Sequence, residues 1–173
     1  MRRASPTGSL VLYGEPRLTK DIDITLGASL DRLPDVLALA EKAALKPLVA
    51  PETFTRRTMV LPCEDPTTGI RVDLVFSFSP YERKALERVR RVRMGQADVR
   101  FASLEDVIIH KVIAGRPRDL EDVRAMLLKN PRVDLLYTRR WLREFSDALS
   151  EPFLDRFNEV LKTIGVGASD ETR

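Results

Sequence analysis

The stretch that decides the fold is GEPRLTKDIDITL, which runs from Gly14 to Leu26. Its second half alternates aspartate with isoleucine and ends near a β-branched threonine, and this pattern predicts a strand over Lys20–Leu26. Side chains alternate along a strand, so Asp21 and Asp23 share one face and the two isoleucines share the other. Carboxylates at these positions lie roughly 7 Å apart, a spacing that suits oxygen ligation of hard cations.

A third aspartate occurs in a second expected strand, RVDLVF, within residues 70–78. The apolar side chains of this strand face one way and leave Asp73 on the opposite face. If the two strands are neighbours, the three carboxylates converge, and Mg²⁺ typically takes a few carboxylates together with substrate phosphates. The alternative is that these aspartates are edge-strand charges that discourage aggregation.

A glycine-serine pair, Gly8-Ser9, precedes Asp21 with eleven residues between them. A glycine-serine turn that opens a short helix presents backbone N–H groups and a hydroxyl to an anion, which is a common way to hold phosphates. The alternative is that Ser9 is an ordinary helix cap.

A lysine is expected on a buried helix face. The segment SLEDVIIHKVIAG, residues 103–115, predicts a helix capped by Ser103. At about 100° per residue, Lys111 falls near the middle of the apolar face, whereas Glu105, Asp106 and His110 do not. A lysine in that position must reach solvent or meet a negative charge.

The next segment, GRPRDLEDV, supplies that negative charge. It begins a second helix, in which Asp119 lies on the side of the apolar residues and Asp122 at the edge of that side. Two facing helices would then present Lys111 and Asp119 to one site. Two interpretations remain open: a structural ion pair, or a lysine that holds a triphosphate.

The order of the expected elements indicates an α+β protein, because strands with one or two helices among them come first and a helical half follows. The strands are expected over residues 20–26, 58–62, 70–78, 89–94 and 99–101, the last two as a hairpin around Gly95. The helices are expected over residues 29–45, 80–87, 103–114, 118–129, 134–149 and 152–163, with Pro47 and Pro51 as breaks after the first.

The composition is that of a globular protein: 173 residues, of which 43% are hydrophobic and 32% charged, with a formal net charge of +3. This length allows one domain with a substantial core. The single Cys63 excludes an intramolecular disulfide and a multi-cysteine metal site, and it fits a reducing cytoplasm. No apolar run approaches about 18 residues, so we expect no membrane span and a cytoplasmic location.

Positive charge is concentrated in one short run within residues 88–93, made of Arg88, Arg90, Arg91 and Arg93. Such a run is usually a solvated face, and the alternative is a surface that steers RNA through its phosphates. Few aromatic residues accompany the run, so base stacking is not indicated.

The motifs together resemble the nucleotidyltransferase fold. PRLTKDIDITL, RVDLVF and SLEDVIIHKVIAGRPRDLEDV come in the order seen in the AbiEii-type nucleotidyltransferases, which include toxins of bacterial toxin–antitoxin systems. The minimal nucleotidyltransferases are more distant kin. The resemblance covers roughly residues 8–145 and implies a small mixed β-sheet core followed by a C-terminal helical half.

The resemblance implies roles for individual residues. Asp21, Asp23 and Asp73 would be catalytic Mg²⁺ ligands, with Asp73 activating the attacking hydroxyl. The phosphates of an NTP would be bound by Gly8, Ser9, Arg17, Lys111 and Asp119. Relatives transfer a nucleoside monophosphate from an NTP to tRNA ends or to a partner protein, so the expected partners are an NTP, tRNA, and a cognate antitoxin or toxin protein in a phage-defence setting.

The resemblance also implies a domain organisation. Residues 1–102 would form the nucleotidyltransferase core, residues 103–165 would complete the site, and residues 166–173 would be a disordered tail. In this fold an apolar strand usually precedes the glycine-serine turn, whereas here only MRRASPT does, so the first strand is expected to be short or missing. The other explanation is that the sequence begins downstream of the true start.

Two further classes of function remain as alternatives. The first is a degenerate, non-catalytic nucleotidyltransferase-fold protein that binds a partner or a nucleotide, motivated by the short N-terminus. The second is a helical nucleic-acid-binding protein, which no helix-turn-helix pattern supports.

Overall fold

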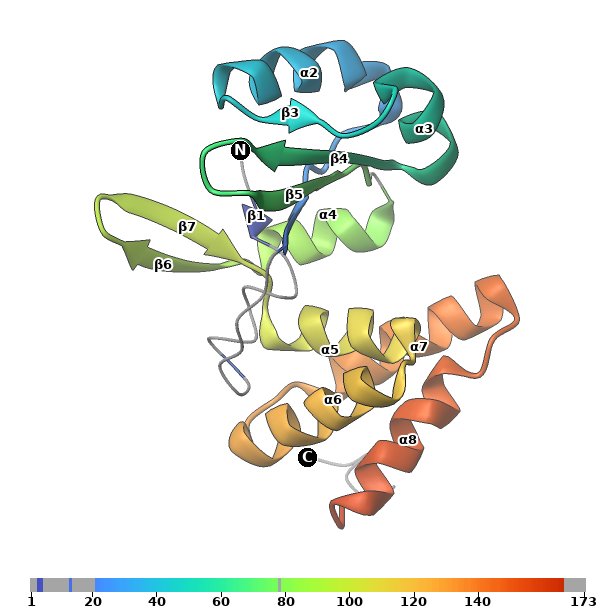
Figure 1. Cartoon of the computed structure of the whole chain (residues 1–173). Helices are drawn as coiled ribbons and strands as arrows, with labels where there is room; N and C mark the ends of the chain where they lie inside the picture. Colours follow the sequence, from blue (N-terminus) through green and yellow to red (C-terminus); the bar gives the residue numbers. More distant parts are fainter. Residues whose placement is uncertain (1–2, 5–12, 14–20, 78, 167–173) are drawn as a thin grey trace. The chain divides into compact units, whose positions relative to one another are not determined.

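The computed structural model describes residues 3–4, 13, 21–77 and 79–166, and these divide into two compact units (Figure 1). The first unit holds residues 3–4 and the described residues from 21 to 102, and contains every strand found among the described residues. The second holds residue 13 together with residues 103–166 and is helical. The predicted α+β class is confirmed.

The first unit is built on a mixed four-stranded sheet with the order β2-β5-β4-β3. Strand β2 runs parallel to β5, and β4 runs antiparallel to both β5 and β3. The bounds of these strands are β2 (Asp21–Thr25), β3 (Lys46–Pro47), β4 (Val60–Asp65) and β5 (Ile70–Val75). The sequence therefore predicted β2, β4 and β5, and missed the short edge strand β3.

One face of this sheet forms the core of the unit. The 3₁₀ turn η1 (Leu30–Arg32) leads into α2 (Leu33–Lys42), which packs its apolar side chains on that face. The alternation along each strand decides which side chains take part. The buried cluster consists of Ile24, Leu33, Val36, Ala40, Leu61, Cys63, Val72, Leu74 and Phe76.

A helix occurs where the sequence predicted only a break. Helix α3 (Pro51–Thr58) has its proline at the first helical position, where a missing N–H costs no hydrogen bond. Pro51 therefore begins a helix and does not merely end the preceding one. The expected helix over 29–45 is also shorter than predicted, because α2 ends at Lys42.

The rest of the first unit is a short helix and a second sheet. Helix α4 (Pro80–Glu87) carries a capping box between Ser79 and Glu82. Strands β6 (Arg90–Met94) and β7 (Ala97–Phe101) form the predicted hairpin, in which Gly95 takes a φ of 58°. Strand β1 (Arg3–Ala4) pairs parallel with β7 and gives the order β1-β7-β6.

The second unit contains four helices among its described residues: α5 (Leu104–Ala114), α6 (Pro117–Lys129), α7 (Leu135–Leu149) and α8 (Phe153–Thr163). Each predicted range agrees with the structure to within one residue at each end. In the described part of the chain, no helix has both the length and the apolar character needed to cross a membrane.

Helix α5 is the centre of this unit and packs against α6, α7 and α8. It is consequently buried on more than one face, and the prediction that Asp106 lies off the buried side was wrong. Asp106 is 1% exposed; it accepts hydrogen bonds from the Ser103 hydroxyl at 2.7 Å and the Tyr137 hydroxyl at 3.0 Å. His110 is exposed, as expected.

The single cysteine offers a test of the first unit's integrity. Cys63 lies on β4 with no exposed surface, and burial, with a smaller effect of the Asp73 charge, raises the pKa of its thiol to about 11. An unfolded thiol ionises at a lower pH, roughly 8.5. We therefore expect iodoacetamide to modify the native chain far more slowly than the urea-unfolded chain at roughly pH 8, as followed by intact mass.

The same burial predicts a pH dependence. Because the pKa of the Cys63 thiol is higher in the folded chain than in the unfolded chain, ionisation of this thiol favours unfolding. The stability that the neutral thiol contributes is complete at a pH below the unfolded pKa and is lost as pH rises toward about 11. Cys63→Ala should flatten this part of the pH profile. Equal alkylation rates in native and unfolded chains would contradict the buried position.

Candidate functional site

The three aspartates that the sequence analysis predicted as metal ligands lie on one face of the four-stranded sheet. Strands β2 and β5 are neighbours, and Asp23 pairs in register with Asp73 while Asp21 pairs with Arg71. Register partners point to the same side of a sheet, opposite to the apolar face that carries Ile24. The structure thus places Asp21, Asp23 and Asp73 together on the face away from the core.

Among the residues that the structure describes, Arg71 places a positive charge beside these aspartates. Its Nε donates a hydrogen bond to Oδ1 of Asp73 at 2.8 Å, and the two side chains are 51% and 19% exposed. The bond to Asp73, followed by the charges of Asp21 and Asp23, raises the pKa of Arg71 above its ordinary value. Arg71 was not identified as a counter-ion from the sequence.

The carboxylates on this face are oxygen ligands of the type that divalent cations take. Three carboxylates offer hard oxygen ligands, and two of them, Asp23 and Asp73, are directly opposite on parallel strands. Among the residues that the structure describes, however, no three His, Cys, Asp or Glu side chains are gathered closely enough to hold a metal ion. The donor set is present, and one member of it bonds to arginine.

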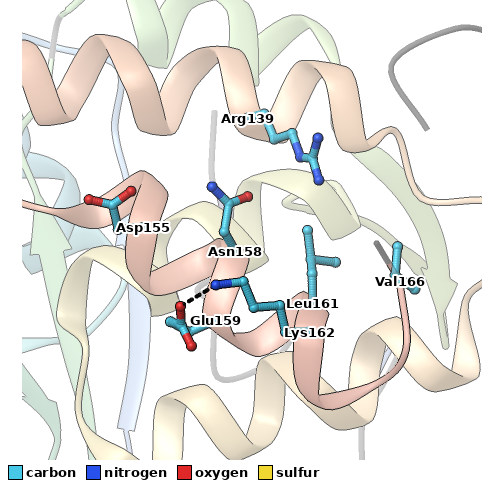
Figure 2. Close-up of a pocket in the computed structure, with 7 residues that line it drawn as sticks. All are labelled: Arg139, Asp155, Asn158, Glu159, Leu161, Lys162 and Val166. Atoms are coloured by element: carbon cyan, nitrogen blue, oxygen red, sulfur yellow. Dashed lines mark hydrogen bonds and ion pairs between the residues drawn. The ribbon is translucent and has the colours of Figure 1, made fainter. Parts of the chain in front are cut away.

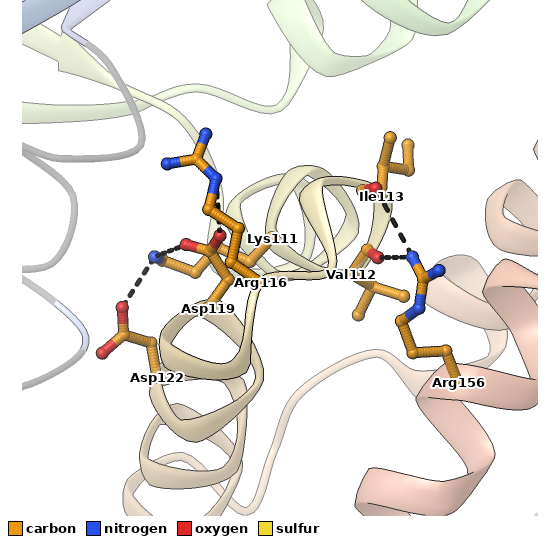
Figure 3. Close-up of polar contacts among 7 residues, drawn as sticks. All are labelled: Lys111, Val112, Ile113, Arg116, Asp119, Asp122 and Arg156. Atoms are coloured by element: carbon orange, nitrogen blue, oxygen red, sulfur yellow. Dashed lines mark hydrogen bonds and ion pairs between the residues drawn. The ribbon is translucent and has the colours of Figure 1, made fainter.

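A second polar cluster lies within the helical unit (Figure 3). Lys111 on α5 is only 7% exposed, and its Nζ donates to Asp119 at 3.0 Å and to Asp122 at 2.7 Å, both on α6. The expected contact between Lys111 and Asp119 is therefore present. Arg116 adds a longer ion pair to Asp119, at 3.6 Å, from an exposed position.

Asp122 was not among the predicted site residues. The sequence placed it only at the edge of the helix face, but residues three apart on a helix are neighbours on its surface. Both carboxylates of the motif RDLED therefore reach the same ammonium group. The DxxD spacing is the signal that would have identified Asp122.

The turn between α5 and α6 brings these groups together. Gly115 ends α5 with a φ of 63°, and Pro117 takes the first turn of α6. Arg156, from α8, donates to the carbonyl of Val112 at 2.7 Å and more weakly to that of Ile113 (Figure 3). The positive φ of Gly115 is a conformation that other residues rarely adopt, so the turn favours glycine, and a Cβ there would also displace the Arg156 guanidinium, 2.5 Å away.

Three predicted site residues, Gly8, Ser9 and Arg17, lie outside the described residues. The phosphate-binding turn is therefore still a prediction.

A pocket of about 240 Å³ occurs elsewhere in the helical unit (Figure 2). Its lining comes from α7, α8 and the residues after α8, and includes the ion pair between Glu159 and Lys162 at 2.7 Å. None of the predicted site residues lines this pocket, so we do not assign the function to it.

The Lys111 cluster yields a stability prediction. Replacing the lysine removes the ammonium group that both mostly buried carboxylates share and leaves Asp119 with its longer ion pair to the exposed Arg116. Removing one partner of a buried ion pair typically costs about 3–5 kcal/mol. We expect Lys111→Met to lower the free energy of unfolding by an amount in that range, measured by urea denaturation.

Two further variants separate charge from packing. Adding Asp119→Asn and Asp122→Asn to Lys111→Met should restore much of the lost stability, because the buried negative charges are then gone. Arg116→Ala, at an 80% exposed side chain, should change the free energy of unfolding by less than about 1 kcal/mol. An undiminished stability of Lys111→Met would show that the ion pair is not a structural element.

Comparison with known proteins gives a family match. The chain matches the family described as nucleotidyl transferase AbiEii toxin, Type IV TA system, over residues 9–164. A comparison with curated protein sequences gives no match. A crystal structure of an antigenic nucleotidyltransferase-like protein from Paracoccidioides brasiliensis is similar at 15% identity and a TM-score of 0.47, covering 90% of this chain and 84% of that one.

Proposed function

The chain belongs to the AbiEii nucleotidyl transferase toxin family, and on this premise we propose that it moves a nucleoside monophosphate from an NTP to a hydroxyl of an RNA, such as tRNA, or of a protein. We further propose that the reaction depends on Mg²⁺ and operates in a toxin–antitoxin system. The observation that carries the proposal is the register of β2 with β5, which puts Asp23 opposite Asp73.

The carboxylate face would supply the metal ligands. Asp21, Asp23 and Asp73 would hold Mg²⁺, which when bound would neutralise charge on the phosphates. The attacking hydroxyl oxygen bonds to the α-phosphorus, and the bond to pyrophosphate breaks. Asp73, whose side chain is 19% exposed and pairs with Arg71, would accept the hydroxyl proton.

The phosphates would be bound by other residues of the chain. Lys111 has three N–H donors, of which Asp119 and Asp122 take two, and we assign the third to a phosphate oxygen. Asp119 would then act by fixing the position of the ammonium group. Gly8, Ser9 and Arg17 complete this proposed set.

Transfer activity tests the proposal directly. The purified chain is incubated with Mg²⁺, each α-labelled NTP in turn, and either total bacterial tRNA or a cell lysate, and the label is followed into RNA or protein. We expect Asp21→Asn to reduce transfer by at least about a hundredfold, because removing one metal ligand weakens the charge stabilisation on which phosphoryl-group chemistry depends.

A matched control separates the site from surface charge. Asp35 is an exposed carboxylate on α2 that pairs with Arg32, and Asp35→Asn should keep full transfer. Equal activity of Asp21→Asn and the parent chain would disprove the metal assignment. Nucleotide binding without transfer, from a folded chain, would support the degenerate binding module in place of the enzyme.

Arg71 leads to a prediction about metal affinity. Its guanidinium bonds to Asp73 and lies near Asp21 and Asp23, so it competes with any cation for these carboxylates. We expect Arg71→Gln to bind Mn²⁺ about tenfold more tightly, measured by electron paramagnetic resonance in the absence of NTP, since about 1.4 kcal/mol of repulsion is removed.

The corresponding control is Arg32→Gln, which removes an arginine paired with a different carboxylate and should leave Mn²⁺ affinity unchanged. Weaker binding by Arg71→Gln would mean that the arginine orients Asp73 for the metal.

A further inference from the structure

The three-stranded sheet carries a row of arginine positions across its strands. Arg3 on β1 pairs in register with Arg100 on β7, and Arg100 pairs with Arg91 on β6. Neighbouring strands lie about 4.8 Å apart, so three arginine positions follow one another across the sheet at that spacing. The sequence run within residues 88–93 did not reveal this row, because two of its members come from other segments.

Repulsion between the arginine charges of this row lowers the stability of the folded protein when no ligand is bound. Like charges directly opposite each other on neighbouring strands are destabilising. The next register pair on the same face, Arg93 with Asp98, is already neutral, with an ion pair of 3.2 Å. Within the described part of the chain, neither Arg91 nor Arg100 forms an ion pair, so the charge of these two side chains is not compensated there.

The two faces of the hairpin differ in chemistry. Arg91, Arg93, Asp98 and Arg100 occupy one face, and the other face carries Arg90 together with the apolar side chains of Val92, Val99 and Phe101. A protein partner normally requires an apolar centre in its interface, which the arginine face lacks. Guanidinium groups bind phosphate oxygens in bidentate fashion, so a chain of phosphodiesters is the ligand that this face fits.

We propose that the row formed by Arg91 and Arg100, with the Arg3 position beside it, binds the phosphate backbone of RNA. The choice of RNA rests on the proposed function, in which an RNA hydroxyl is an acceptor. The contact is electrostatic and independent of base sequence, since the face carries no aromatic side chain for stacking. The location of the binding surface rests on the register of the strands alone.

The test measures binding and requires no catalysis. A short fluorescein-labelled single-stranded RNA of mixed sequence is titrated with the full chain carrying Asp21→Asn, in EDTA, at several salt concentrations. In that background, Arg91→Gln with Arg100→Gln should weaken binding about tenfold at moderate salt, and should reduce the slope of log affinity against log salt by about 1.4, or 0.7 per phosphate contact.

Matched variants identify the cause of any change. Arg56→Gln with Arg57→Gln removes two exposed positive charges from α3 of the same unit. This control should leave the RNA affinity and the slope of log affinity against log salt nearly unchanged. The double variant of the row should be at least as stable toward heat as the parent, because a repulsive pair is gone. A loss of stability would overturn the proposal by assigning the row a structural role.

The remaining outcomes concern the ligand. Competition by unlabelled RNA together with weak competition by polyglutamate supports the proposal. Stronger competition by polyglutamate than by RNA would overturn it in favour of an acidic protein partner, and equal affinity of the parent and the row variant for RNA would overturn it outright. Because no NTP or metal is present, a failure of nucleotidyl transfer would leave these results unaffected.

Discussion

The parallel pairing of β2 with β5 is the constraint on which the proposed chemistry depends. One register places Asp23 opposite Asp73, and it simultaneously places Ile24 beside Leu74 on the face that α2 covers. A slip by one residue would send the aspartates into the core and the apolar residues to the outside. Burial of the apolar face therefore determines the strand register, and this register in turn determines the relative positions of the aspartates on the opposite face.

In the helical unit, the packing of the helices likewise determines where charged side chains lie. Lys111 is buried because α5 is packed on three sides, and a buried ammonium group must be paired. The glycine turn after α5 returns the chain so that α6 delivers both of its aspartates to that group. Arg156 holds the end of α5 from a third helix, so the position of the lysine depends on the packing of the whole unit.

The sequence predicted the features that depend on local periodicity and missed those that depend on distant partners. The strand of Asp21 and Asp23, the helices of the second unit and the burial of Lys111 all follow from side-chain alternation or helical spacing. Helix α3 was missed because Pro51 was read as a stop, although proline is equally suited to a start. The burial of Asp106 and the arginine row across three strands required knowledge of which segments become neighbours.

Among the described residues, the two groups of carboxylates considered above each contain a cation from the chain itself, Arg71 in one and Lys111 in the other. Exchange of partners costs less than leaving a charge unpaired, particularly where water is partly excluded. A metal–nucleotide complex carries both signs of charge, so under the proposed function its cation would pair with the carboxylates and its phosphates with the released arginine. A free cation or a free anion would satisfy one partner and leave the other unpaired, whereas the complex would satisfy both.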